Sequence, residues 1–237
     1  MRILLIAGHG AGYPGAIGCG YTEAELTRKV VAGVEPILSG FADVEVFDPS
    51  KKMSNYIAKG NSFDFTPYDY VLEIHFNAIK ESISDGKVKG SEILVHPTEG
   101  VTTVEELILQ NLKELGFTNR GVKKNRWDLI VMNTCKGAQS VSYALVEVCF
   151  IDDPDDMNIY LNNTAAVNHA IAEGVIGGYG LSPKPLLVNA DEITWELNHQ
   201  FFPINDFSGF ISALDEAKKS NSPLYWGYYK LANKITV

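Results

Sequence analysis

The stretch YVLEIHF at residues 70–76 gives the clearest indication of the fold. It is almost continuously apolar, which is typical of a strand that is buried on both faces of a sheet. Similar runs predict further strands at residues 3–7, 44–47, 92–96, 129–133 and 145–151. Helical patterns predict helices at residues 23–38, 53–58, 104–115, 155–161 and 165–176. This alternation predicts an α/β fold with a buried, largely parallel sheet.

The composition argues against several functional classes. The chain has 237 residues, 46% of them apolar, and a formal net charge of −9. Lysine and arginine do not cluster, so we expect neither nucleic acid nor a membrane as a partner. There is no run of about 18 apolar residues that could span a membrane. Residues 1–7 are too short for a signal peptide, so we expect a protein made in the cytoplasm without an export signal.

A change of composition near residue 183 predicts two domains, residues 1–182 and 183–237. Residues 177–185 read as a helix end followed by a linker. Beyond them we expect a small helical module with helices at residues 191–199, 207–219 and 223–233. Nine aromatic residues fall in it. So small a module often needs association for stability, which predicts a homo-oligomer; docking onto the first domain is the alternative.

Three features of the sequence are weak evidence for a function. GAGYPG at residues 10–15 matches the GxGxxG pattern of dinucleotide-binding folds, but Pro14 and more loop follow where the helix should begin. The three cysteines form neither a disulfide framework nor a CxxC pattern, and we expect Cys149 to be a small buried residue. The acidic run at residues 152–156 lacks the ligand spacing of a calcium loop and is more typical of a helix start.

Three residues predict a metal site. His9 and His75 each lie at the end of a predicted strand, and the carboxyl ends of strands are where sites collect in open α/β sheets. Thr22 is expected to cap the next helix, with Glu25 reaching back to it, which leaves Glu23 free. Two histidines and a glutamate are the ligand set of many catalytic zinc hydrolases. The alternative is that each histidine is structural and that Glu23 only complements the helix dipole.

Glu147 is an acid in the middle of an apolar strand, LVEVCFI at residues 145–151. An unpaired buried carboxylate is costly, so it must become neutral, pair with a cation or face one. A structural salt bridge is one interpretation. Beside a metal, the same carboxylate could act as the base that removes a proton from water.

Five motifs together resemble the N-acetylmuramoyl-L-alanine amidases of the type 3 family. They are AGHG at residues 7–10, TEAELT at 22–27, EIHFNA at 73–78, RGVK at 120–123 and LVEVCFI at 145–151. The resemblance covers residues 1 to about 180. Cys149 stands where the family usually has glycine, and Asp153 where asparagine is common, which puts only local packing in doubt. The C-terminal segment resembles, less specifically, small modules of endolysins from phages of Gram-positive bacteria.

The resemblance implies a mixed sheet flanked by helices. It also implies one Zn²⁺ per chain held by His9, Glu23 and His75, with Glu147 catalytic. The expected reaction is hydrolysis of the amide between N-acetylmuramic acid and L-alanine in peptidoglycan. We expect Asn77 and Arg120 to contact the substrate, and a phage endolysin that stays in the host cytoplasm until its release to the wall.

Two other functions stay open at this point. A zinc carboxypeptidase or aminopeptidase could use the same ligands on a similar fold. A protein that binds peptidoglycan and a wall polymer without catalysis is the other possibility.

Overall fold

The computed structural model describes residues 1–10, 12–79, 88–124 and 129–184. Nearly all of them belong to one compact unit, Met1–Ser182. The predicted helices of residues 183–237 fall almost wholly outside the described residues, so they stay a prediction. Within the described part, no helix is both long and apolar enough to cross a membrane.

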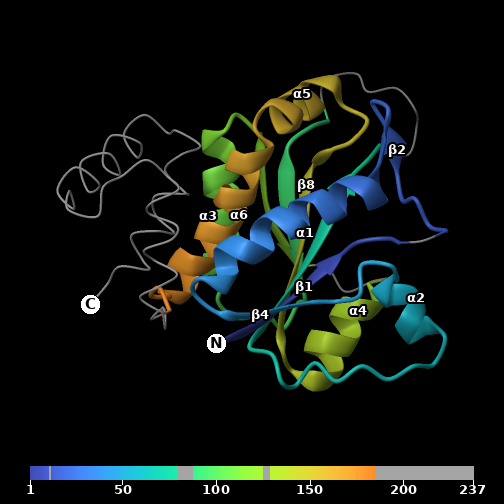
Figure 1. Cartoon of the computed structure of the whole chain (residues 1–237), viewed down its shortest axis with the longest axis vertical. Helices are drawn as coiled ribbons and strands as arrows, with labels where there is room; N and C mark the ends of the chain where they lie inside the picture. Colours follow the sequence, from blue (N-terminus) through green and yellow to red (C-terminus); the bar gives the residue numbers. More distant parts are fainter. Residues whose placement is uncertain (11, 80–87, 125–128, 185–237) are drawn as a thin grey trace, which may run out of the picture. The chain divides into compact units, whose positions relative to one another are not determined.

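A six-stranded sheet forms the centre of the unit, in the order β4-β1-β5-β8-β6-β7 (Figure 1). Strands β1, β4, β5 and β8 run parallel to one another, and β6 and β7 run in the opposite direction. The strands span β1 Arg2–Ala7, β4 Asp43–Val46, β5 Tyr70–Asn77, β6 Ser91–Val95, β7 Asn119–Lys124 and β8 Ser142–Phe150. The predicted mixed, largely parallel sheet is therefore confirmed.

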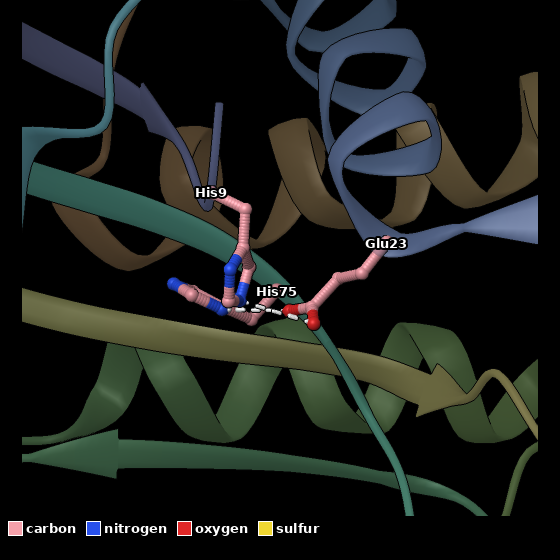
Figure 2. A group of neighbouring side chains, drawn as sticks. All are labelled: His9, Glu23 and His75. Atoms are coloured by element: carbon pink, nitrogen blue, oxygen red, sulfur yellow. Dashed lines mark hydrogen bonds and ion pairs between the residues drawn. The ribbon is translucent and has the colours of Figure 1, made fainter. Parts of the chain in front are cut away.

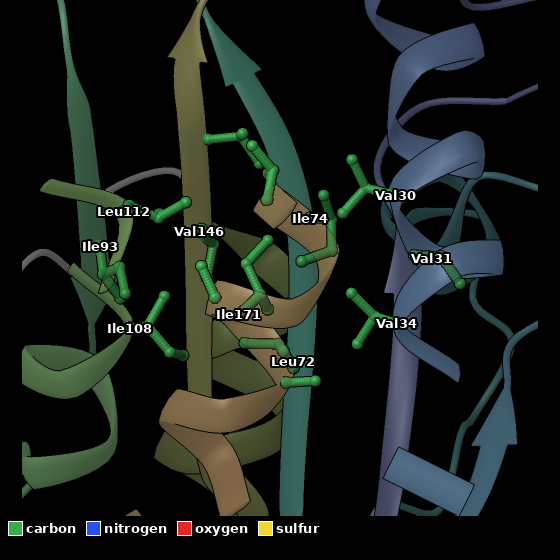
Figure 3. Close-up of a cluster of buried hydrophobic side chains, with 14 of the residues drawn as sticks. Val30, Val31, Val34, Leu72, Ile74, Ile93, Ile108, Leu112, Val146 and Ile171 are labelled. Atoms are coloured by element: carbon green, nitrogen blue, oxygen red, sulfur yellow. The ribbon is translucent and has the colours of Figure 1, made fainter. Parts of the chain in front are cut away.

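One face of the sheet packs against the three long helices and α5. These are α1 Glu23–Ser39, α3 Thr103–Glu114, α5 Pro154–Asn162 and α6 Thr164–Tyr179. Figure 3 shows how side chains of α1, α3 and α6 close over the central strands. Leu72 and Ile74 of β5 and Val146 of β8 are fully buried there. Burial of this apolar surface is the main contribution to the stability of the unit.

The other face carries a smaller core. It packs against α2 Met53–Ala58, α4 Ile130–Met132 and the π-helix η1 Asn133–Ala138. Val71 of β5 and Tyr143 and Leu145 of β8 are buried on this side. Because side chains alternate between faces, the same pattern places Glu73, His75 and Glu147 on the face of this smaller core.

The longer predicted elements agree with the structure except at two places, and the short strands β2 Ile17–Gly18 and β3 Tyr21–Thr22 were not predicted. Residues 129–133 were expected as a strand, and this prediction is wrong: they hold α4 and the start of η1. Their apolar run, LIVMN, does not by itself distinguish a strand from a buried helical turn. Strand β7 was missed because it is a mostly polar edge strand, Asn-Arg-Gly-Val-Lys-Lys, without an apolar pattern.

Helix α1 begins where the sequence predicts, but its cap differs in part. The Glu25 amide donates to Thr22 Oγ1 at 3.3 Å, as expected for an N-cap. The Glu25 carboxylate pairs with Lys29 at 2.7 Å instead of reaching back to Thr22. A short hairpin of β2 Ile17–Gly18 and β3 Tyr21–Thr22 precedes the helix. In the described residues of the GxGxxG stretch, 10 and 12–15, no helix begins, in keeping with the weak nucleotide interpretation.

Helix α5 accounts for the acidic run at residues 152–156. Asp153 is its N-cap and accepts a hydrogen bond from the Asp156 amide at 2.9 Å. The Asp156 carboxylate accepts from the amides of Gly90 and Phe150, so it joins the start of the helix to β6 and β8. The prediction that these acids serve a helix start is confirmed.

Candidate active site

Three residues from distant parts of the chain meet beside the carboxyl ends of β1 and β5. Figure 2 shows His9 on the loop after β1, Glu23 at the start of α1 and His75 near the end of β5. One ligand atom from each of them can be chosen so that all three lie within 4.8 Å of one another. Among the described residues this is the one group of three or more side chains with metal-ligand chemistry at such spacing.

The loop that carries His9 is held in a strained conformation. His9 has φ +62°, in the left-handed region that side chains other than glycine seldom adopt. Arg28 of α1 donates to the carbonyl oxygens of Gly8 at 3.0 Å and His9 at 2.9 Å. Thr27 donates to the Gly8 carbonyl as well, at 2.9 Å. These contacts from α1 hold the strained backbone of the loop in place.

Two glycines let the backbone pack against this group. A Cβ added at Gly8 would lie 2.5 Å from ring atoms of His75. A Cβ at Gly15, which has φ +71°, would lie 2.5 Å from Glu23 Oε2 and 2.8 Å from the His9 ring. The glycine-rich loop therefore serves close packing around the site.

Glu23 binds both histidines while almost fully buried. Its Oε1 lies 2.8 Å from His75 Nδ1, and its Oε2 lies 3.1 Å from His9 Nε2. The amides of Phe76 and Ala16 donate to the two oxygens. Burial alone would raise the pKa of Glu23, but the hydrogen bonds to His75 and His9 hold it well below its usual value. Glu23 is therefore a carboxylate that faces two nitrogen ligands.

His75 is oriented from its far side by a second carboxylate. Its Nε2 lies 3.0 Å from Glu73 Oε1, and Tyr143 donates its hydroxyl to Glu73 Oε2 at 2.5 Å. With Nε2 as the donor to Glu73, the lone pair of Nδ1 points to the Glu23 side. Such a carboxylate partner fixes the tautomer and ring direction of a metal-ligating histidine.

Glu147 lies beside His75 on the neighbouring strand, where the two residues are register partners. Its Oε2 is buried and has no hydrogen-bond partner among the described residues. Burial raises the pKa of Glu147 to about 7; His75 opposes the shift, and Glu23, Glu92 and Glu73 add to it. A carboxyl group of this kind is suited to proton transfer near neutral pH.

Residues 3–177 match the model of a known family, described as N-acetylmuramoyl-L-alanine amidase. The chain belongs to this family, amidase type 3. It is 30% identical over 253 residues to the probable autolysin PH of Staphylococcus aureus, an alignment that covers 98% of this chain. The chain spans about half the length of that relative, 48%.

Solved structures share the fold. The amidase AmiC2 of Nostoc punctiforme superposes with a TM-score of 0.61 at 18% identity, over 76% of this chain and 97% of that one. Cwp6 from Clostridium difficile superposes with a TM-score of 0.60 at 26% identity, over 76% of this chain and 29% of that one. The first likeness shows the fold alone.

The residues of this amidase family member fit a zinc ion. Zinc with ligand bonds of about 2.1 Å in tetrahedral geometry places its ligand atoms about 3.4 Å apart. In the structure the two histidines contact different oxygens of Glu23, at 2.8 and 3.1 Å, and one ligand atom from each residue lies within 4.8 Å of the others, so the spacing is of the right size and the side chains would adjust around the ion. His9, Glu23 and His75 would be the ligands, with Nε2 of His9 and Nδ1 of His75 directed to the metal.

The two residues expected to contact substrate converge on a third. Asn77 donates to Glu92 Oε1 at 3.0 Å, and Arg120 donates through Nε to Glu92 Oε2 at 2.7 Å. Lys123 contacts the same Oε2. Glu92 is the register partner of Glu147 on the side away from His75, so this group adjoins the candidate catalytic residue.

The sequence interpretation missed several of these residues. Glu73 lies between apolar residues in its strand, the same signal that pointed to Glu147, so that signal could have found it. Glu92 follows Ser91 near the start of its strand and gave a weaker signal. Arg28 and Tyr143 gave no such signal, because a helix arginine and a strand tyrosine are unremarkable without tertiary contacts. Of the remaining histidines, His96 contacts Thr98 outside the site, and His199 lies outside the described residues.

Proposed function

We propose that this chain is a zinc-dependent N-acetylmuramoyl-L-alanine amidase that hydrolyses the amide between N-acetylmuramic acid and L-alanine in peptidoglycan. One observation carries the proposal. Glu147 has a buried carboxylate oxygen without a hydrogen-bond partner among the described residues, and it lies beside His75, which belongs to a compact His₂Glu group. Family membership supplies the substrate class.

Each residue has a separate role in this proposal. His9, Glu23 and His75 would hold one Zn²⁺ per chain. Bound there, the ion would polarise the scissile carbonyl and lower the pKa of a water molecule. Glu147 takes a proton from the attacking water as the new C–O bond forms. It returns that proton to the alanine nitrogen as the C–N bond breaks, leaving a lactyl carboxylic acid and a free amine.

Analysis of digested cell wall tests the reaction. Purified Gram-positive wall should yield new alanine N-termini by mass spectrometry, without new glycan reducing ends. New N-termini at other residues would indicate a peptidase instead. Wall that is bound but not cleaved would indicate a binding protein without catalysis.

Two variants with matched controls test the roles. Glu147→Gln should keep the fold and lose about 10²- to 10⁴-fold in turnover, the usual contribution of general acid–base catalysis. Glu105→Gln removes another buried acid, on the opposite face of the sheet, and should keep activity. Elemental analysis should find about one zinc per chain, lost in His75→Ala and kept in His96→Ala. Near-normal turnover of Glu147→Gln would remove it from the mechanism.

We further propose that residues 1–182 form the catalytic domain and residues 183–237 bind the wall, with the whole acting as a phage endolysin released from the host cytoplasm. The aromatic content of the C-terminal segment and its resemblance to endolysin modules support this. A chain ended after Ser182 should still cleave soluble muropeptides but bind intact wall more weakly than the full chain. The full chain should sediment above monomer mass if the segment associates. Equal wall binding by both chains would contradict the proposal.

A further inference from the structure

Polar side chains form a row across the sheet that extends beyond the proposed catalytic group. His75 of β5 and Glu147 of β8 are register partners, and so are Glu147 and Glu92 of β6. Residues in register point to the same face of a sheet. The row continues to β7, whose Arg120 and Lys123 contact Glu92. His75 and the two cations thus lie on one face, on either side of Glu147.

The far end of this row carries an excess positive charge. Two cations share one carboxylate, and both bind the same oxygen, Glu92 Oε2. The other oxygen, Oε1, is taken by Asn77. Glu92 is nearly buried, whereas the side chains of Arg120 and Lys123 are 28% and 43% exposed. Glu92 therefore holds both cations in position, and its single negative charge balances only one of their two positive charges.

Arg120 is set up to bind a further anion. It contacts Glu92 only through Nε, and its guanidinium carbon lies 4.9 Å from the centroid of the Phe150 ring. Its two Nη nitrogens have no partner within the part of the chain that the structure describes. A guanidinium with free Nη groups binds a carboxylate through two parallel hydrogen bonds. Lys123 adds donors next to it.

We propose that Arg120 and Lys123 form a subsite for a free carboxylate on the peptide part of the substrate. This inference rests on the proposed amidase function. Strands lie about 4.8 Å apart, so β7 is about 10 Å from Glu147 on β8, and the side chains reach back over part of that distance. A peptide extends about 3.5 Å per residue. The carboxylate therefore belongs about two residues beyond the scissile amide.

The second stem residue offers such a group. In peptidoglycan it is a D-glutamate linked through its side-chain carboxyl, so its α-carboxyl is either a free carboxylate or, after modification, a carboxamide. The glycan side of the bond carries no free carboxylate once the lactyl group is in the amide. The subsite would thus select stems with an unamidated second residue and set the direction of the peptide across Glu147.

The test compares two purified walls that differ only in whether this α-carboxyl is free or amidated. The full zinc-loaded chain should release alanine N-termini from the free-carboxyl wall about tenfold faster or more, as expected for a charge-assisted hydrogen bond. Arg120→Gln and Lys123→Gln should bring the ratio of the two rates towards one. Lys29→Gln removes the same charge from an exposed pair on α1 and should leave the ratio unchanged.

Calorimetry of the product dipeptides separates the subsite from the reaction. L-alanyl-D-isoglutamate should bind the full chain more tightly than its carboxamide counterpart, and Arg120→Gln should abolish the difference. Equal cleavage of both walls, or equal binding of both dipeptides, would overturn the subsite. If neither wall is cleaved, the proposed function fails, and the dipeptide comparison still decides whether the subsite exists.

Discussion

Removing the carboxylate of Glu73 should weaken zinc binding although Glu73 does not belong to the proposed ligand set. Glu73 lies 3.0 Å from His75 Nε2, and His75 Nδ1 lies 2.8 Å from Glu23. In Glu73→Ala the His75 ring would lose the partner of its Nε2, and with it the contact that keeps Nδ1 unprotonated and directed to the metal. Loss of such a partner usually costs about 10- to 100-fold in metal affinity, which is about 1.4–2.7 kcal/mol.

The substitution also affects stability, and this has to be separated from the effect on the metal. Tyr143 is fully buried and donates to Glu73 at 2.5 Å, so Glu73→Ala leaves its hydroxyl without an acceptor. A buried unpaired hydroxyl costs about 1–3 kcal/mol. Tyr70→Phe is the matched control, because Tyr70 is as deeply buried and donates to Glu105 at 2.8 Å away from the site. It should lower stability while leaving zinc affinity unchanged.

Glu73→Gln distinguishes orientation from charge. Its amide oxygen can accept from His75 Nε2 while its amide nitrogen donates to Tyr143, so the ring stays in place and only the negative charge is lost. We expect its zinc affinity to lie between those of the wild type and Glu73→Ala. Affinity is measured by competition with a chromophoric chelator, and stability by thermal unfolding without metal. A folded Glu73→Ala that binds zinc within twofold of the wild type would refute the reasoning.

Three further predictions concern the loop and the core. Gly15→Ala should lower the zinc content, because its Cβ would lie too close to Glu23 Oε2. Gly12→Ala is the control: Gly12 has φ +77°, so the substitution costs the same backbone strain of about 1–3 kcal/mol, but no atom lies within 4 Å of the added Cβ. The Gly12→Ala variant should therefore keep its zinc. Equal zinc in both would contradict this. Burial raises the pKa of Glu105 above its ordinary value, and the hydrogen bond from Tyr70 only partly opposes this shift. The protonated form of Glu105 is therefore favoured in the folded state, and the stability that it contributes at low pH is lost as the pH rises through the folded pKa. Glu105→Gln should therefore gain in Tm over wild type from about pH 4 to pH 7, and a constant difference would count against it. Gly8→Ala should displace the His75 ring and reduce zinc affinity by chelator competition; unchanged affinity would show that the ring is not confined there.

Most of the fold could be predicted because its strands are buried on both faces. Continuous apolar runs such as residues 70–76 identify such strands without any knowledge of their partners. The edge strand β7 could not be found in this way, since half of its surface faces solvent and its residues are polar. Residues 129–133 were wrongly predicted as a strand because they are apolar. They are buried against the sheet as a short helix, and an apolar run indicates burial without showing whether the backbone is extended or helical.

The candidate ligands could be predicted because their residue types are unusual at their positions in the sequence. Residues that only hold the ligands in position could not be predicted. His9, Glu23 and His75 were proposed because two histidines at strand ends and a free acid at a helix start together make up the ligand set of many zinc hydrolases. Arg28, which holds the Gly8 and His9 carbonyls, lies in a helix where an arginine is ordinary. Its role depends on a tertiary contact that the sequence does not encode locally.

Three acids on one face of the sheet show how the same signal leads to different chemistry. Glu73, Glu92 and Glu147 all lie in strands, where an ionised carboxylate is costly unless it is paired. Glu73 is paired by His75 and Tyr143. Glu92 is paired by two cations and Asn77. Glu147 alone of the three keeps a buried oxygen without a partner in the described structure. A structural salt bridge, the plainest interpretation of Glu147 from sequence, therefore fits Glu92 instead. The cost of leaving Glu147 unpaired must be offset elsewhere in the fold, and proton transfer at the neighbouring site is the use that would retain it.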